Sequence, residues 1–194
     1  MKLADLDVDE IYSYYDYFQW KFEERVELIK GKIFKMSPAA NYYHQLLAGR
    51  LHREISNFLH KKPCKVFFAP FDVRFPRKSN DDKEIYTVLQ PDLCIICDPS
   101  KLDKRGCIGA PDIVIEILSP SNNTRDLKYK YDIYEESGVK EYWVVFPEER
   151  TMLVYTLTSG IYIASRFKMK EDIITTPVLP GFIMQLADIF QEED

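Results

Sequence analysis

Residues 111–119 read Pro-Asp-Ile-Val-Ile-Glu-Ile-Leu-Ser, an almost continuous apolar run with one carboxylate, Glu116, in its middle. A strand that is covered on both faces of a sheet has this character, so the run predicts a buried central strand. An ionised glutamate there is costly unless it is paired, hydrogen-bonded or bound to a metal ion. Glu116 therefore indicates a partner nearby, and the functional interpretation depends on which residues supply it.

The chain has 194 residues, of which 46% are hydrophobic and 29% are charged, as is ordinary for a globular protein. This length suffices for one full core, and we expect 1–194 to form a single domain. No apolar run approaches the roughly 18 residues of a membrane span. The first ten residues are too acidic for a signal peptide. We therefore expect a cytoplasmic protein without a membrane partner.

The net charge of −5 excludes a strongly basic nucleic-acid-binding protein. A nuclease that is acidic overall can still carry one basic groove. For each cluster of cations alone, a solvated surface is the simpler interpretation. The clusters are Lys61, Lys62 and Lys65; Arg74, Arg77 and Lys78; Lys101, Lys104 and Arg105; and Arg125, Lys128 and Lys130.

The chain has four cysteines, and two of them, Cys94 and Cys97, form a Cys-x-x-Cys motif inside a strand-like apolar run. An offset of three residues points two side chains to opposite faces of a strand. No second motif or histidine pair completes a set of zinc ligands. We interpret these cysteines as small buried apolar residues.

Apolar periodicity predicts helices at 3–17, at 42–60 with Asn41 as its cap, and from Asn123 or Thr124 to about Ser137. The unit 112–146 is expected to be a right-handed parallel crossover, and 173–190 a closing strand and short helix. Together these elements indicate a mixed α/β fold. Strand patterns occur at 25–29, 32–36, 65–75, 85–98, 111–119, 141–146, 152–157 and 161–167.

Asp92 begins a predicted strand that a short loop joins to the strand of Glu116. Such strands are usually antiparallel neighbours, which places Asp92 near Glu116. Asp112 shares the face of Glu116 but lies at the far end of the strand. Two adjacent carboxylates repel, and a divalent cation, which prefers oxygen ligands, removes the repulsion. The pair predicts a metal site and metal-assisted hydrolysis.

The helix after Glu116 carries Asp126, Lys130 and Tyr134 at intervals of four, along one helical face. We expect Lys130 to reach back toward the carboxylates, where a cation would neutralise a developing oxyanion. Lys128 points about half a turn away.

Simpler interpretations of these residues stay open. Glu116 could form a structural ion pair with Lys130 or Arg125, because structural networks also hold buried charges. Lys130 could pair with Asp126 along the helix, and Tyr134 could be a core residue with a bonded hydroxyl.

Several motifs in this order resemble the Uma-type restriction endonuclease family of the PD-(D/E)XK nuclease superfamily. The resemblance covers most of the chain. Its motifs are Glu27-Leu-Ile-Lys-Gly31, Met36-Ser-Pro, His44, Pro91-Asp92-Leu, Pro111 to Pro120 with Glu116, then Asp126, Lys130, Tyr134, Gly138 and Glu141-Tyr-Trp.

The resemblance implies a restriction-endonuclease-like core, with a mixed β-sheet flanked by helices and added β-hairpins. It implies cleavage of DNA, dependence on Mg²⁺ or Mn²⁺, and a homodimer. Asp92 and Glu116 are then the metal-binding carboxylates, and Lys130 is the catalytic lysine. The superfamily's lysine stands two residues after the second acid, where this chain has Leu118, a departure that the Uma-type family shares.

Four further residues are accessory candidates by the same resemblance: Glu27, His44, Asp126 and Tyr134. Glu27 could otherwise be an ordinary strand-edge carboxylate, and His44 a surface or capping histidine. Two other functions stay open: a catalytically weak nucleic-acid-binding or protein-interaction module, and a scaffold without an active site. Stabilisation by Mn²⁺ or Mg²⁺ distinguishes a metal site from a scaffold.

Overall fold

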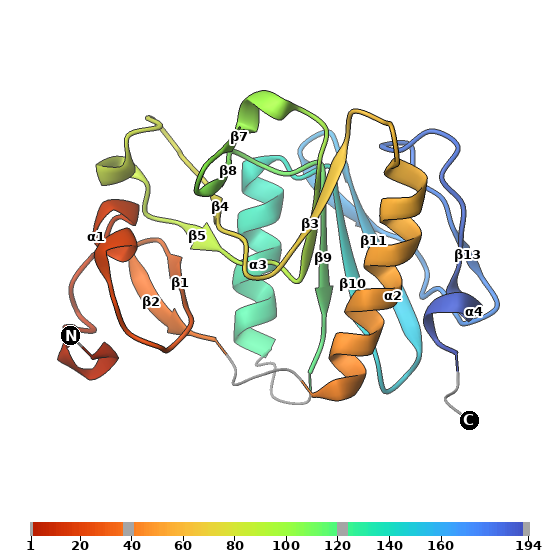
Figure 1. Ribbon diagram of the computed structural model, residues 1–194, viewed down its shortest axis with the longest axis horizontal. Coiled ribbons are helices and arrows are strands. Elements are labelled where there is room, and N and C mark those ends of the chain that lie inside the picture. Colours follow the sequence, from red (N-terminus) through yellow and green to blue (C-terminus); the bar gives the residue numbers. More distant parts are fainter. Residues whose placement is uncertain (1, 37–40, 120–123, 192–194) are drawn as a thin grey trace.

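In the computed structural model of the chain, helix α3 (Thr124–Ser137) lies between two six-stranded mixed β-sheets (Figure 1). The structure describes residues 2–36, 41–119 and 124–191, with the backbone alone at 124–126. Mixed sheets flanked by helices, with hairpins at their edges, confirm the predicted fold class. Within the described residues, no helix combines the length and the apolar character that a membrane span requires.

The central strand β9 (Ile113–Ile117) lies in the larger sheet, whose strand order is β12-β11-β10-β9-β6-β3. It pairs antiparallel with β6 and parallel with β10, as the sequence predicted. All five of its residues are buried, Glu116 included, because layers of the protein cover both faces. The other strands of this sheet are β3 (Lys65–Phe68), β6 (Leu93–Ile96), β10 (Glu141–Phe146), β11 (Thr151–Thr158) and β12 (Ile161–Ala164).

Helix α2 (Tyr42–Leu59) covers one face of this sheet with its apolar side. Its leucines and isoleucine at intervals of four, among them Leu47, Leu51 and Ile55, pack with Ile113 and other odd-numbered residues of β9. Asn41 caps the helix as predicted, because its side-chain oxygen accepts a hydrogen bond from the backbone N–H of His44. The C-terminal elements β13 (Ile173–Ile174), β14 (Met184–Gln185) and α4 (Leu186–Ile189) complete this layer.

The opposite face of the sheet packs on α3, and the smaller sheet packs on the other side of that helix. Its strand order is β2-β1-β5-β4-β8-β7. The predicted hairpin β1–β2 is confirmed, with Lys30 and Gly31 at φ values of 52° and 81° in its turn. The strands are β1 (Val26–Ile29), β2 (Lys32–Lys35), β4 (Val73–Arg74), β5 (Val88–Leu89), β7 (Leu102–Asp103) and β8 (Gly106–Ile108).

Three predicted elements are wrong in extent. The expected helix at 3–17 is replaced by α1 (Tyr14–Gln19) and a 3₁₀ turn at Leu3–Asp5. The helix starts late because Ser13 and Asp16 form a reciprocal cap. The expected strands 65–75 and 85–98 each divide into two strands of different sheets, at Ala69–Pro70 and Gln90–Pro91, where proline supplies no N–H to a ladder.

The cysteine interpretation is partly wrong. Cys94 and Cys97 do point to opposite sides of β6, since Cys94 packs toward α3 and Cys97 toward α2. Cys97, however, forms a disulfide with Cys64, which precedes the neighbouring strand β3. Cys94 and Cys107 are buried free thiols. The disulfide fastens the edge strand of the larger sheet beside the end of α2.

Candidate functional site

Glu116 projects from β9 toward α3, where two side chains of that helix meet it. The hydroxyl of Tyr134 donates a hydrogen bond of 2.8 Å to Oε1 of Glu116, and Nζ of Lys130 lies 3.1 Å from the same oxygen. Lys130 and Tyr134 are four residues apart, so both project from one face of α3. Lys130 is only 6% exposed and Glu116 only 5%. Water therefore screens this ion pair little.

Glu27 brings a second buried carboxylate to Lys130 from the smaller sheet. Its Oε1 lies 3.4 Å from Nζ of Lys130 and accepts a hydrogen bond of 2.8 Å from the backbone N–H of Gln90. Glu27 is 3% exposed, inside the apolar strand β1. The family resemblance marks Glu27 only as an accessory candidate. The signal was present, because Val26 to Ile29 is an apolar run with one carboxylate, as in β9.

Asp92 immediately precedes β6, and continuing the β6–β9 register places it opposite Glu116. Its Oδ2 accepts a hydrogen bond of 2.8 Å from the backbone N–H of Ile117 and lies 3.2 Å from Nε2 of His44. The Asp92 side chain is 23% exposed, against 7% for the Glu116 side chain. Asp92 is therefore the member of the pair that solvent reaches more easily.

His44 lies in the first turn of α2 and joins this helix to Asp92. The Asn41 side chain accepts a hydrogen bond from the backbone N–H of His44 and so fixes the start of the helix. His44 is 8% exposed, and among the described residues its Nδ1 has no hydrogen-bond partner. Burial lowers the pKa of His44, but the hydrogen bond to Asp92 and the charge of Asp92 raise it more, so that it lies above its ordinary value.

The charges and the burial around Glu116 shift the pKa values of this carboxyl group and of Tyr134. Burial raises the pKa of this carboxyl group, the charge of Lys130 lowers it, and the charges of Asp92 and Glu27 raise it again, leaving it above its ordinary value. Burial, together with the charge of Glu116, holds the pKa of Tyr134 well above 10, so its hydroxyl stays a donor. Glu116 and Glu27 thus share one ammonium group while the charge of Asp92 also acts on Glu116, so the carboxylates outnumber the cation of Lys130.

The other predicted residues lie apart from this group or outside the description. Asp112 lies at the far end of β9, where it accepts hydrogen bonds of 2.7 Å from the N–H of Cys97 and from Lys140. Lys128 is exposed. The side chains of Asp126 and Arg125, like Asn123 as a whole, lie outside the described residues.

The donor set fits a divalent cation that takes few protein ligands. In the ranges 2–36, 41–119 and 124–191, no three or more His, Cys, Asp or Glu side chains are grouped so that they could hold a metal ion together. Mg²⁺ is commonly bound by one or two carboxylates, with water and phosphate oxygens as its other ligands. Asp92 and Glu116 match that pattern, and a cation would offset the shortage of positive charge around Glu116.

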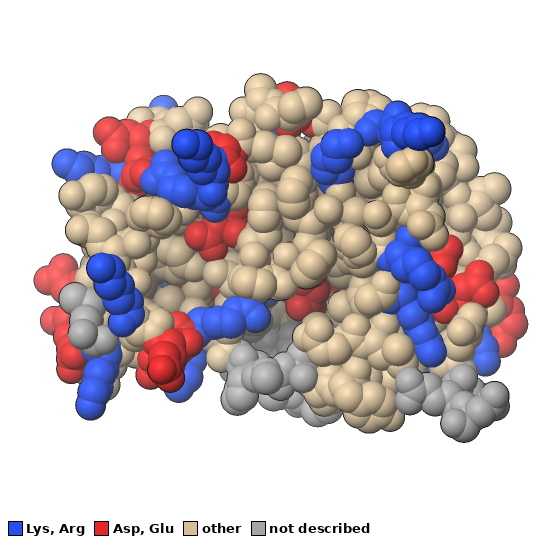
Figure 2. All heavy atoms as spheres, viewed as in Figure 1, with Lys and Arg blue, Asp and Glu red and all other residues tan. Residues whose placement is uncertain are grey.

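Charged side chains on the surface are distributed in patches. On the face shown in Figure 2, Lys and Arg side chains form separate groups, with Asp and Glu groups between them. One basic group lies over the part of the view that α2 occupies in Figure 1. A nucleic acid on this face would therefore meet local basic contacts rather than a uniform field.

The chain is similar to known proteins in sequence and in fold. The Uma2 family, described as "Putative restriction endonuclease", matches residues 14–187. An uncharacterized protein of Synechocystis sp. is 27% identical over 121 residues, which are 61% of this chain and 60% of that protein. The chain thus matches about three fifths of the length of this curated relative.

A similar fold occurs in the crystal structure of a protein from Anabaena variabilis, described as a putative nuclease belonging to DUF820. The TM-score is 0.72 at 19% identity, and the match covers 92% of this chain and 97% of that one. At this identity the likeness concerns the fold. Because the family match extends over most of the sequence, the chain belongs to the Uma2 family of restriction-endonuclease-related proteins.

Proposed function

We propose that the chain is a metal-dependent endonuclease that hydrolyses phosphodiester bonds of DNA. Asp92 and Glu116 bind the divalent cation, and Lys130 assists the reaction. The observation that carries the proposal is the position of Lys130, 3.1 Å from Glu116 and 3.4 Å from Glu27, at the strand that holds the proposed metal ligand. Membership of the Uma2 family supports the same chemistry.

A cation at Asp92 and Glu116 is favoured by the charges already in place. Glu116 is buried beside two other carboxylates, and its pKa is raised for that reason. When bound, Mg²⁺ or Mn²⁺ supplies positive charge that polarises a phosphoryl oxygen and makes a water molecule more acidic. The residues around Asp92 and Glu116 then have separate roles, which follow from their contacts.

Lys130 supplies the fixed positive charge of the site. Its ammonium group is held by carboxylates from both sheets, so the position of the charge is set before a substrate arrives. Hydrolysis of a phosphodiester adds negative charge to the phosphoryl oxygens, and a preorganised cation stabilises that charge without reorganising. Lys130 thereby replaces the superfamily lysine that would occupy the position of Leu118.

Four residues position the proposed metal ligands and Lys130. Tyr134 donates to Oε1 of Glu116, which fixes the orientation of that carboxylate. Glu27 orients Lys130. The N–H of Ile117 and the ring of His44 fix one oxygen of Asp92. Groups that orient metal ligands commonly matter nearly as much as the ligands themselves.

A catalytically weak DNA-binding module on the same fold is the second candidate. The observation that favours it is the deep burial of the Glu116–Lys130 pair, since a purely structural ion pair has the same appearance. The two candidates differ in their response to metal. The endonuclease cuts DNA with Mg²⁺ or Mn²⁺ and stops when a chelator is added, whereas the module binds DNA equally with a chelator and cuts nothing.

The homodimer, which the family resemblance implies, stays a prediction. The cytoplasmic location, which the sequence pattern indicates, stays a prediction as well. Analytical ultracentrifugation of the purified chain tests the first. A sedimentation coefficient that stays monomeric across a wide range of protein concentrations would contradict it.

A further inference from the structure

A cavity of about 400 Å³ lies at the C-terminal end of α3, away from the Asp92–Glu116 pair. Its walls come from residues after β4, from Thr87, from the Gly109–Ala110 segment before β9, and from the last turn of α3. Glu136 follows Lys130 by six residues, a rise of about 9 Å along the helix. None of the lining residues belongs to the proposed catalytic group.

One wall of the cavity is apolar and firmly held. Phe75 is 4% exposed, and its ring packs on Tyr134 with centroids 5.9 Å apart, so it cannot easily turn away. Pro76, Ala110 and Ile133 extend this wall. Because Phe75 and Ile133 are almost fully buried, the accessible apolar surface of this wall comes from Pro76 and Ala110.

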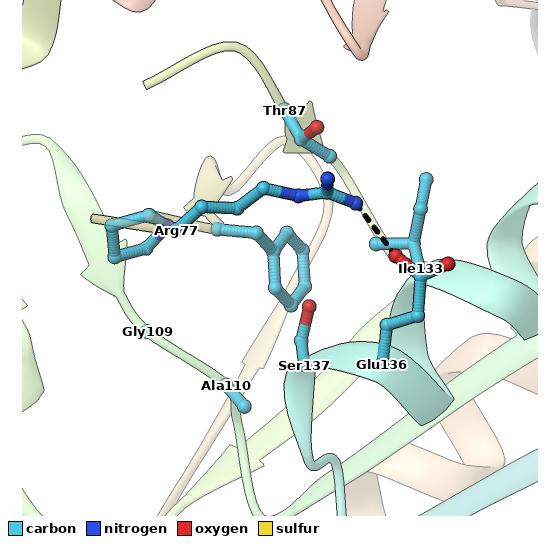
Figure 3. Close-up of a pocket in the computed structure, with 9 residues that line it drawn as sticks. Arg77, Thr87, Gly109, Ala110, Ile133, Glu136 and Ser137 are labelled. Atoms are coloured by element: carbon cyan, nitrogen blue, oxygen red, sulfur yellow. Dashed lines mark hydrogen bonds and ion pairs between the residues drawn. The ribbon is translucent and has the colours of Figure 1, made fainter. Parts of the chain in front are cut away.

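The charged side chains at the cavity carry an excess of positive charge. Nη2 of Arg77 lies 2.6 Å from Oε2 of Glu136, and Nζ of Lys30 lies 3.8 Å from Oε1 of the same carboxylate. Figure 3 shows Arg77 reaching across the cavity to Glu136. Two cations share one carboxylate, which leaves about one positive charge. The partial negative charge of about half a unit at the helix C-terminus does not cancel it.

An anionic ligand can readily replace Glu136 as the partner of Arg77. The side chains of Arg77 and Glu136 are 68% and 50% exposed, and ion pairs in such positions contribute little to stability. An arginine guanidinium binds phosphate through paired hydrogen bonds. A phosphate can therefore take the place of Glu136 beside Arg77 and Lys30.

Two hydroxyl groups complete the lining. Thr87 is 7% exposed, and its oxygen accepts a hydrogen bond of 3.2 Å from the backbone N–H of Lys30, a bond that does not use the hydroxyl proton. Ser137 lies on the other side, at the end of α3 (Figure 3). The volume is near the lower end of ligand sites, which span about 300–1,000 Å³. The cavity therefore suits a small molecule with a ring, hydroxyl groups and an anionic group.

We propose that this cavity binds a nucleotide, with its base against Pro76 and Ala110 and its phosphate on Arg77 and Lys30. The nucleotide is either free in solution or part of a bound strand. The second case rests on the proposed nuclease function, and the cavity then lies about 9 Å along the axis of α3 from Lys130, measured at Glu136.

The test is a titration of the full chain with adenosine monophosphate, followed by NMR or calorimetry, beside inorganic phosphate and adenosine as separate probes. Arg77→Gln should weaken binding about 10- to 100-fold, the effect of losing hydrogen bonds to a charged group. Glu136→Gln should tighten binding, because it releases both cations. Ala110→Leu, which fills the cavity, should weaken binding. Lys104→Gln removes one charge from an exposed lysine elsewhere and should change nothing.

A second binding measurement distinguishes a free nucleotide from a nucleotide of a bound strand. It uses a short oligonucleotide and the Glu116→Gln protein, which is expected to bind DNA without cutting it. Weaker oligonucleotide binding by a chain that also carries Arg77→Gln identifies a nucleotide of the strand. Unchanged oligonucleotide binding, with loss of the mononucleotide, identifies a free ligand. Equal affinity of wild type and Arg77→Gln for adenosine monophosphate, or no binding to either, overturns the proposal, whatever the outcome of the cleavage assay.

Discussion

The ammonium nitrogen of Lys130 lies 3.1 Å from Oε1 of Glu116, and both residues are almost fully buried. The lysine comes from α3 and the glutamate from the central strand β9, while Glu27 contacts the same ammonium group from the other sheet. One cation therefore links three layers of the fold. This arrangement makes the site sensitive to the loss of either charge.

Lys130→Met should destabilise the protein by about 3–5 kcal/mol at about pH 9.5, above the Glu116 pKa of about 8, because it leaves buried carboxylates without their cation. The loss should be smaller at about pH 5.5, since Glu116, whose pKa is raised, can take up a proton there. Urea unfolding at the two pH values measures both effects. Lys128→Met, an exposed lysine on the same helix, is the control and should change stability by at most about 0.5 kcal/mol. Equal stability of wild type and Lys130→Met at the higher pH would contradict this interpretation.

His44→Ala should weaken Mn²⁺ binding about 10- to 100-fold, because Asp92 loses the ring that orients it. His44→Gln keeps a side-chain N–H donor that can reach Asp92, and its affinity should stay close to wild type. His60→Ala, an exposed histidine that follows α2, is the control. Calorimetric titration with Mn²⁺ compares the four proteins. If His44→Ala binds Mn²⁺ as tightly as wild type, His44 does not position the ligand.

Glu141 gives a prediction of pH dependence outside the site. It is 1% exposed, and burial raises its pKa although the side chains of Trp143 and Thr176 hydrogen-bond to it. A raised pKa means that the folded state holds the proton more tightly than the unfolded state, whose pKa is about 4.3. The contribution of Glu141 to stability is therefore present below that value and is lost as pH rises toward the folded pKa.

Glu141→Gln cannot ionise, so its stability does not fall as pH rises in the way that Glu141 causes. The glutamine keeps an acceptor for the indole N–H of Trp143. The free energy of unfolding of Glu141→Gln, relative to wild type, should accordingly increase with pH above about 4 and then level off. Denaturation curves across this range measure the difference. Parallel stability profiles of the two proteins would show that the Glu141 pKa is not raised.

The disulfide between Cys64 and Cys97 joins residues 33 positions apart in the sequence. Replacing both by serine should cost about 2–4 kcal/mol, chiefly through the greater freedom of the unfolded chain. A dithiol reductant should lower the unfolding midpoint of wild type and leave the double variant unchanged. Wild type that is insensitive to a reductant able to reach the disulfide would contradict a stabilising role.

The sequence predicted the neighbourhood of Glu116 well because that neighbourhood rests on local rules. A short connection implied antiparallel pairing of β6 with β9, and intervals of four placed Lys130 and Tyr134 on one helical face. The roles of these residues in metal binding and catalysis stay predictions.

The division of the chain into two sheets was not predictable from local patterns. Proline at 70 and 91 interrupts the two strands that were predicted as continuous, and which sheet each half joins depends on contacts with distant segments. The contact of Glu27 with Lys130 has the same origin, since it forms only when the smaller sheet packs on α3. The Cys64–Cys97 disulfide likewise follows from the pairing of β3 with β6, which a Cys-x-x-Cys motif does not reveal.

Cleavage of supercoiled plasmid DNA by wild type and Glu116→Gln, in Mg²⁺, in Mn²⁺ and in chelator, tests whether Glu116 binds a catalytic metal ion. Glu141→Gln, another buried glutamate on the adjacent strand β10, is the matched control and should cut at the wild-type rate. We predict metal-dependent cutting by wild type and a loss of at least about 100-fold in Glu116→Gln, because a metal ligand is gone. Equal cutting by wild type and Glu116→Gln, or cutting that persists in chelator, would show that the chain is not a nuclease with Glu116 as a metal ligand.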